Sequence, residues 1–171
     1  MQANSNGTQI DPTKILTLKI IIGALMAGAT IFALIALSQV MATGSEAAAK
    51  SQDPFMIFGF PGMEVTGIVV VLSILVNIVA PKIQTAITKS ALQQAPDKLT
   101  AIQSGVMVRM VMAEFIALLG IVFVFLSAPN APLPAYAWAL YFPLLLLYLA
   151  GIENFPSEAK IANKIQELEN S

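Results

Sequence analysis

Four long apolar stretches constrain the fold of this chain more than any other feature of its sequence. They cover about residues 20–42, 56–80, 106–128 and 133–152, and each reaches the roughly 20 residues that an α-helix needs to cross about 30 Å of hydrocarbon. Backbone amides in lipid must be hydrogen-bonded within their own segment, so helices are expected rather than single strands. We therefore predict an all-α integral membrane protein, a four-helix bundle of two helical hairpins.

The composition agrees with this prediction. Of the 171 residues, 57% are hydrophobic and 11% are charged, whereas a soluble domain carries about 25% charged residues. The first apolar stretch is too long for a signal-peptide h-region of about 7–15 residues. We expect an amino-terminal tail over 1–19, a four-span domain over 20–152, and a carboxyl-terminal tail over 153–171 that forms a short cytoplasmic helix.

The absence of two residue types excludes much chemistry. The sequence contains no Cys and no His, which removes disulfides, thiol chemistry, catalytic His and the usual zinc and haem ligands. No arrangement of the remaining polar residues matches a catalytic site, and the net charge of −1 suggests no nucleic-acid partner. We expect no enzymatic activity, no metal and no cofactor, with the lipid bilayer as the main partner.

The basic residues predict the orientation. Eight of the nine Lys and Arg residues fall on one side of a four-span topology, and only Lys50 falls on the other. Because cytoplasmic loops carry the excess of Lys and Arg, both termini are predicted to lie in the cytoplasm. Among these residues Lys19 and Arg109 are expected to anchor the inner interface, with Arg109 snorkelling to the headgroups. Tyr136 and Trp138 are expected at the outer aromatic belt.

Glu114 is the sharpest polar feature, because it lies near the middle of the third stretch. A charge at that depth costs at least about 2.5 kcal/mol, so Glu114 is expected to face other helices and to be often neutral. Two interpretations stay open: a structural hydrogen bond, or the binding of a proton or ion. Ser73, Asn77 and Tyr148 are the candidate polar partners on the second and fourth stretches.

Segments outside the apolar stretches carry helix signals. Asp97 is a plausible N-cap for a helix that begins before the third stretch, and Ser157 is a plausible N-cap for the tail helix. In that tail Ile161, Ile165 and Leu168 form one apolar stripe, which we expect to dock on a partner or on the inner loop. Pro143 is expected to kink the fourth helix.

The segment around the third stretch resembles a known family. It reads QQAPDKLTAIQSGVMVRMVMAEFIALLGIVFVFLSAP, with Pro96 in a loop that is predicted to be cytoplasmic, Glu114 18 residues later, and Gly120-Ile121-Val122 after it. This pattern is similar to the second helix of the proteolipid c subunit of rotary ATP synthases, in which such a carboxylate carries the ion. The preceding stretch departs from that family, because GIVVVLSILVNIVA has one glycine where the family has several. The whole chain looks more like small uncharacterised bacterial four-span proteins that end in Phe-Pro-Ser/Thr and a charged helix, which implies a bacterial inner membrane.

Two functions from different classes are consistent with these observations. The first is an accessory or structural subunit of a membrane assembly, either a homo-oligomer or a larger membrane complex. The alternative is a proton- or ion-translocating component of the c-subunit type that uses Glu114. A conductor needs a polar path from Glu114 to both faces, and the third stretch offers nothing polar between Glu114 and Ser127. The first function is therefore preferred.

Overall fold

The protein is described here by a computed structural model, in which residues 11–47, 56–94, 97–127 and 133–169 are placed. Their order is α1 (Pro12–Ala47), β1 (Met56–Ile57), β2 (Phe60–Pro61), α2 (Gly62–Gln94), α3 (Lys98–Ser127), the 3₁₀ helix η2 (Ala135–Tyr141), α4 (Phe142–Asn154) and α5 (Glu158–Glu169). Four helical segments are long and apolar enough to cross a membrane: α1, α2, α3 and the continuous η2–α4 segment.

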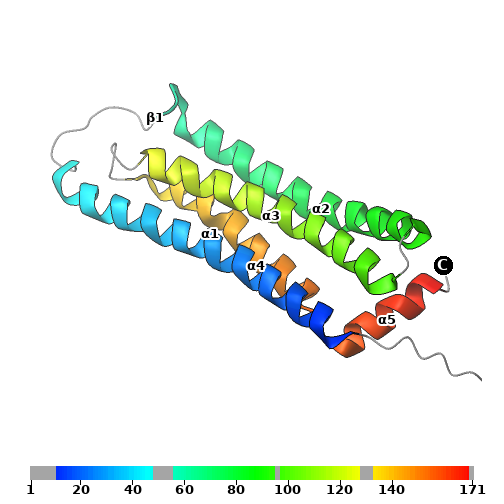
Figure 1. The fold of residues 1–171 in the computed structure, drawn as a ribbon. Helices are drawn as coiled ribbons and strands as arrows, with labels where there is room; N and C mark the ends of the chain where they lie inside the picture. The colour runs from blue at the N-terminus through cyan, green and yellow to red at the C-terminus, as the bar shows by residue number, and fades with distance from the viewer. Residues whose placement is uncertain (1–10, 48–55, 95–96, 128–132, 170–171) are drawn as a thin grey trace, which may run out of the picture.

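These helices lie side by side with α3 in contact with the other three (Figure 1). The short helix α5 lies across one end of the group. At that end Lys14 near the start of α1 pairs with Asp97 before α3, and Gln84 of α2 donates a hydrogen bond to Asn154 at the end of α4. We call this the basic end, because Lys14 and the lysines of α5 lie there. The helices α1 and α3 begin at this end, and α2 and α4 end at it.

The starts of two helices carry the N-caps that the sequence predicts. The backbone N–H of Leu99 donates to Asp97 Oδ1 at 3.1 Å, and that of Lys160 donates to Ser157 Oγ at 3.3 Å. A side-chain acceptor at an N-cap satisfies one of the orphan N–H groups of the first turn. Both caps therefore place the starts of α3 and α5 as the sequence predicted.

The starts of the second and fourth apolar helices differ from expectation. Residues 56–61 form a two-stranded hairpin rather than the first turns of a helix, because Phe58 and Gly59 both adopt positive φ values that suit a tight turn. Pro143 does not kink a helix interior but lies in the first turn of α4. A missing N–H is harmless there, and the 3₁₀ helix η2 supplies the preceding turns.

Close packing between α3 and its neighbours depends on glycine. A Cβ on Gly105 would lie 2.7 Å from the backbone oxygen of Gln84 and closer still to Thr88 Oγ1, both on α2. A Cβ on Gly120 would overlap the backbone oxygen of Leu140 in η2. The missing side chains thus set how closely α2 and η2 approach α3.

The tail helix packs on its own chain. Ile161 and Ile165 are buried and join a core cluster with Ile15 and Leu18 of α1 and Leu99 of α3. The predicted stripe therefore covers the start of α1 and α3; the side chain of Leu168 lies outside the described residues. A tail seated in this way closes the core at the basic end.

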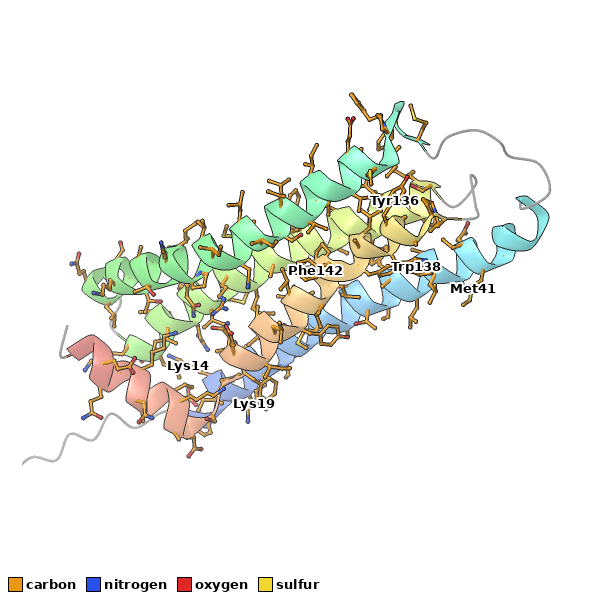
Figure 2. The ribbon with its side chains drawn as sticks, turned by 180° about the vertical axis from the view of Figure 1, so that it is seen from behind. Lys14, Lys19, Met41, Tyr136, Trp138 and Phe142 are labelled. Carbon is orange, nitrogen blue, oxygen red and sulfur yellow. The ribbon has the colours of Figure 1, made fainter. Side chains whose placement is uncertain are left out.

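The outer surface of the long helices is apolar along most of their length. Exposed side chains include Ile31, Phe32, Leu34, Ile68, Val71, Leu75, Ile78, Val111, Phe115, Leu145 and Leu149. Lys14 and Lys19 lie toward one end of the molecule, and Met41, Tyr136 and Trp138 toward the other (Figure 2). The molecule thus has an apolar middle between two differently decorated ends.

Candidate functional site

A group of polar side chains joins three helices near the basic end. We call Gln84 of α2, Arg109 of α3, and Glu153 and Asn154 of α4 the polar cluster. Arg109 Nη1 lies 3.5 Å from Gln84 Oε1, Gln84 Nε2 donates to Asn154 Oδ1 at 2.9 Å, and Arg109 forms an ion pair with Glu153. Asn154 Nδ2 in turn donates to the backbone oxygen of Ala150 at 2.8 Å. The cluster therefore links α2, α3 and α4 through side chains.

Arg109 differs from its predicted role as an interface anchor. Its side chain is only 12% exposed, whereas that of its partner Glu153 is 61% exposed. A guanidinium has five donors in a planar fork, so it can serve Gln84 and Glu153 together. Arg109 thus turns inward and connects helices instead of extending along the outer surface.

The tail helix contributes a second cation near this cluster. Burial lowers the pKa of Lys164 on α5, the positive charge of Arg109 lowers it further, and Glu167 opposes the change. Two cations close together disfavour one another unless acidic groups lie nearby. Glu153 pairs with Arg109, and the charge of Glu167 acts on Lys164.

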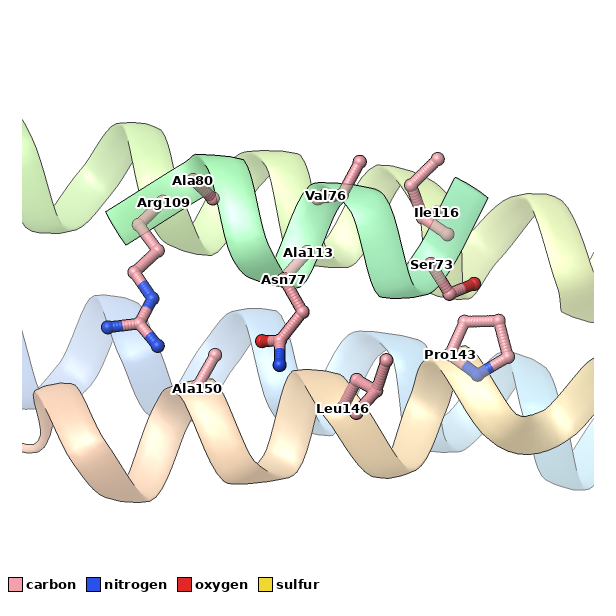
Figure 3. Close-up of a pocket in the computed structure, with 10 residues that line it drawn as sticks. All are labelled: Ser73, Val76, Asn77, Ala80, Arg109, Ala113, Ile116, Pro143, Leu146 and Ala150. Atoms are coloured by element: carbon pink, nitrogen blue, oxygen red, sulfur yellow. The ribbon is translucent and has the colours of Figure 1, made fainter. Parts of the chain in front are cut away.

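A small cavity adjoins the polar cluster between α2, α3 and α4 (Figure 3). Its volume is about 10 Å³, which is close to the minimum needed for one water molecule. Asn77 and Arg109 point into the gap between α2 and α4, and the buried Nε of Arg109 has no hydrogen-bond partner among the described residues. The cavity suits a single water molecule on Arg109 rather than an organic substrate.

The predicted partners of Glu114 are not gathered around it. Ser73 lines the cavity and donates to the backbone oxygen of Val69 at 2.5 Å. Asn77 lines the same cavity, while the hydroxyl of Tyr148 meets that of Thr30 on α1. These side chains are therefore placed in two separate regions.

Glu114 itself is half-buried on another side of α3 from the cavity. At 100° per residue it lies about 140° from Arg109. Met110 and Leu118, one turn before and after it, pack in the core cluster that includes α1 residues. Within the described part of the chain the side chain of Glu114 makes no hydrogen bond or ion pair.

The remaining predicted anchors lie at the two ends. Lys19 Nζ lies 6.0 Å from the centroid of the Phe155 ring. Trp138 is 46% exposed and stacks on Tyr141 with a centroid distance of 5.9 Å, and Tyr136 lies beside it in η2. Their placement is compatible with the two interface positions expected for them.

Sequence reasoning missed the partners that complete these contacts. Gln84, Glu153, Asn154 and Thr30 were not singled out, although Glu153 follows an apolar stretch that ends on the same predicted side as Arg109. That shared side was a usable signal for the ion pair. No group of three or more His, Cys, Asp or Glu suited to a metal occurs in the described residues.

Comparisons with known proteins add no relative. No family model, no curated protein and no solved structure matches the chain. The class of protein therefore follows from the structure alone: a chain whose described residues are almost entirely helical, with four helical segments that are long and apolar enough to cross a membrane.

Proposed function

We propose that this chain is an integral membrane protein whose α1, α2, α3 and η2–α4 cross a bacterial inner membrane as a four-helix bundle. Its support is the apolar outer surface. In the most apolar 18-residue segment of each helix, only 22% of α1 and of α2 and 39% of α3 is buried inside the structure. In water such an exposed apolar surface would be strongly unfavourable. In lipid it is the surface that the hydrocarbon contacts.

The proposed orientation places the basic end in the cytoplasm. Lys14, Lys19 and Lys160 lie at this end with α5, and the last part of α2 and the start of α3 add Lys82, Lys89 and Lys98. The distribution of Lys and Arg across a membrane favours the cytoplasmic side for such a cluster. Both termini are then cytoplasmic.

Within the membrane we propose a structural or accessory role, and no enzymatic one. One observation carries this role: polar side chains inside the apolar helices are used for contacts within the chain. Arg109 pairs with Glu153, Tyr148 with Thr30, and Ser73 with its own backbone. Side chains used in this way hold a bundle together, and they offer no connected path for an ion.

Glu114 is the residue on which the rival function depends. A proton carrier needs polar groups on both sides of its carboxyl, and none contacts Glu114 among the described residues. We therefore assign Glu114 to a site where the neutral acid is tolerated.

Two measurements test the proposal. In proteoliposomes the parent protein is expected to conduct no more protons than empty liposomes, and Glu114→Gln is expected to leave its detergent stability unchanged. Proton flux that Glu114→Gln abolishes would establish the c-subunit-type function instead. A pull-down from membranes in mild detergent, read by mass, should find the chain with further copies or other subunits; a lone monomer would contradict the accessory role.

A further inference from the structure

A groove runs between α1 and α4 and opens toward the basic end. Its volume is about 670 Å³. Its walls come from α1 and α4, and its mouth from the start of α5; the lining residues are Gly23, Met26, Ala27, Tyr148, Gly151, Ile152, Phe155, Ser157 and Lys160. This groove is separate from the cavity beside Arg109, which lies between α2, α3 and α4.

Two of the positions that line the groove are glycines. Gly23 on α1 is exposed, and a Cβ built on it would have no atom within 4 Å. Gly151 on α4 lies so close to Met26 that a Cβ there would overlap the sulfur. Gly151 thus lets α4 approach Met26 of α1 closely, and Gly23 leaves the space beside it open.

Hydrogen-bonded hydroxyls close the inner end. The Tyr148 hydroxyl contacts Thr30 Oγ1, and Thr30 Oγ1 also donates to the backbone oxygen of Met26 at 2.7 Å. Because these hydroxyls are paired with one another, they present no unpaired polar group to an apolar occupant. The groove wall that includes Gly23 of α1 and Ile152 of α4 is therefore suited to contact with a hydrocarbon chain.

The mouth of the groove is cationic. Lys160 Nζ lies 3.4 Å from the backbone oxygens of Ile152 and Glu153, and an ammonium group has a third N–H to donate. Lys19 Nζ lies above the Phe155 ring at the same end. The carboxylate of Glu153 is paired with Arg109. Two ammonium groups thus flank an opening whose interior is apolar.

The distance along α1 from the cationic mouth to the paired hydroxyls corresponds to one leaflet. From Lys19 to Thr30 is 11 residues, or about 16 Å at 1.5 Å per residue. Half of a hydrocarbon core of about 30 Å is about 15 Å. A lipid whose phosphate lies at Lys19 and Lys160 would therefore end its acyl chain near Tyr148.

We propose that this groove binds one anionic phospholipid from the leaflet at the basic end. One acyl chain lies along Gly23, Ala27 and Gly151, and the phosphate accepts hydrogen bonds from Lys160 and Lys19. This inference rests on the proposed membrane location. The lipid fills the space between α1 and α4 and joins them on the side away from α2.

The test titrates phosphatidylglycerol into the detergent-purified full chain and counts bound lipid by native mass spectrometry. Gly23→Leu places a side chain in the groove without a clash, and Gly28→Leu is the matched control, since its Cβ also meets nothing within 4 Å but does not line the groove. We expect Gly23→Leu to lower the affinity at least about tenfold and Gly28→Leu to leave it unchanged. Lys160→Gln should lower it about fivefold, as expected for one Lys near an anionic surface, and Lys82→Gln should not change it.

Three results would overturn the proposal. The first is equal affinity of Gly23→Leu and Gly28→Leu for phosphatidylglycerol. The second is equal affinity of the parent for phosphatidylcholine, which would remove the role of the lysines. The third is a dimer mass that disappears in Gly23→Leu, which would make the groove a contact between two copies. Carbonate extraction of every variant separates these results from failure of the membrane location itself, because a chain that is not embedded would be released by the wash.

Discussion

Replacement of Gly105 by Ala probes the contact that brings α2 against α3. The new Cβ would lie 2.7 Å from the backbone oxygen of Gln84 and would overlap Thr88 Oγ1. A backbone atom cannot rotate away, so the two helices must separate. Overpacking of this kind costs about 1–3 kcal/mol.

The matched control is Gly67→Ala on α2, where a Cβ meets nothing within 4 Å. Both substitutions gain about 0.5–1 kcal/mol from the lower chain entropy of Ala in a helix, and this gain cancels in the comparison. Gly105→Ala is therefore expected to be about 1–3 kcal/mol less stable than Gly67→Ala.

Unfolding of both variants can be followed by circular dichroism as SDS is added to the protein in mild detergent. Adding Thr88→Ala to Gly105→Ala removes one of the two overlapping atoms, so it should recover part of the loss. Equal stability of Gly105→Ala and Gly67→Ala would refute the reasoning. It would mean that α2 and α3 do not approach as closely as described.

Three further predictions concern the ends of the molecule. The hydrogen bond from its lysine partner holds the pKa of Asp97 below its ordinary value. Asp97→Asn, which keeps an N-cap acceptor, should therefore cost up to about 1 kcal/mol at pH 7. A carboxyl group whose pKa is lowered by folding stabilises the folded state when it is ionised, so this difference should vanish as the pH falls through the pKa of Asp97. A difference in denaturant titrations that does not depend on pH would contradict the ion pair. Ile161→Asp should release the tail helix to limited proteolysis while Ala162→Asp, at an exposed position, should not, and equal cleavage would contradict the packing of α5. A Cys introduced at Lys89 should resist an impermeant thiol reagent in intact cells while one at Lys50 should react, and the reverse pattern would invert the proposed orientation.

Helix signals that act over a few residues were readable without the structure. The caps at Asp97 and Ser157 involve atoms two or three residues away. The four apolar stretches predicted the four segments that are long and apolar enough to cross a membrane. The start of α2 was predicted too early, because the apolar character of residues 56–61 hid a turn at Phe58 and Gly59. Hydropathy measures preference for lipid and carries no information on φ.

The candidate site shows what the sequence by itself determined and what only the tertiary structure decided. The sequence determined which residues are unfavourable in an apolar helix, such as Arg109, Glu114 and Tyr148, since that cost depends on residue type and depth alone. It could not determine their partners, because a partner depends on how each helix is rotated and shifted along its neighbour. Tyr148 meets Thr30 across 118 residues, and Arg109 meets Glu153 across 44. A rotation of α3 by one residue, about 100°, would bring a different side chain to each contact, so only the packed helices fix which polar groups pair and leave Glu114 without a partner among the described residues.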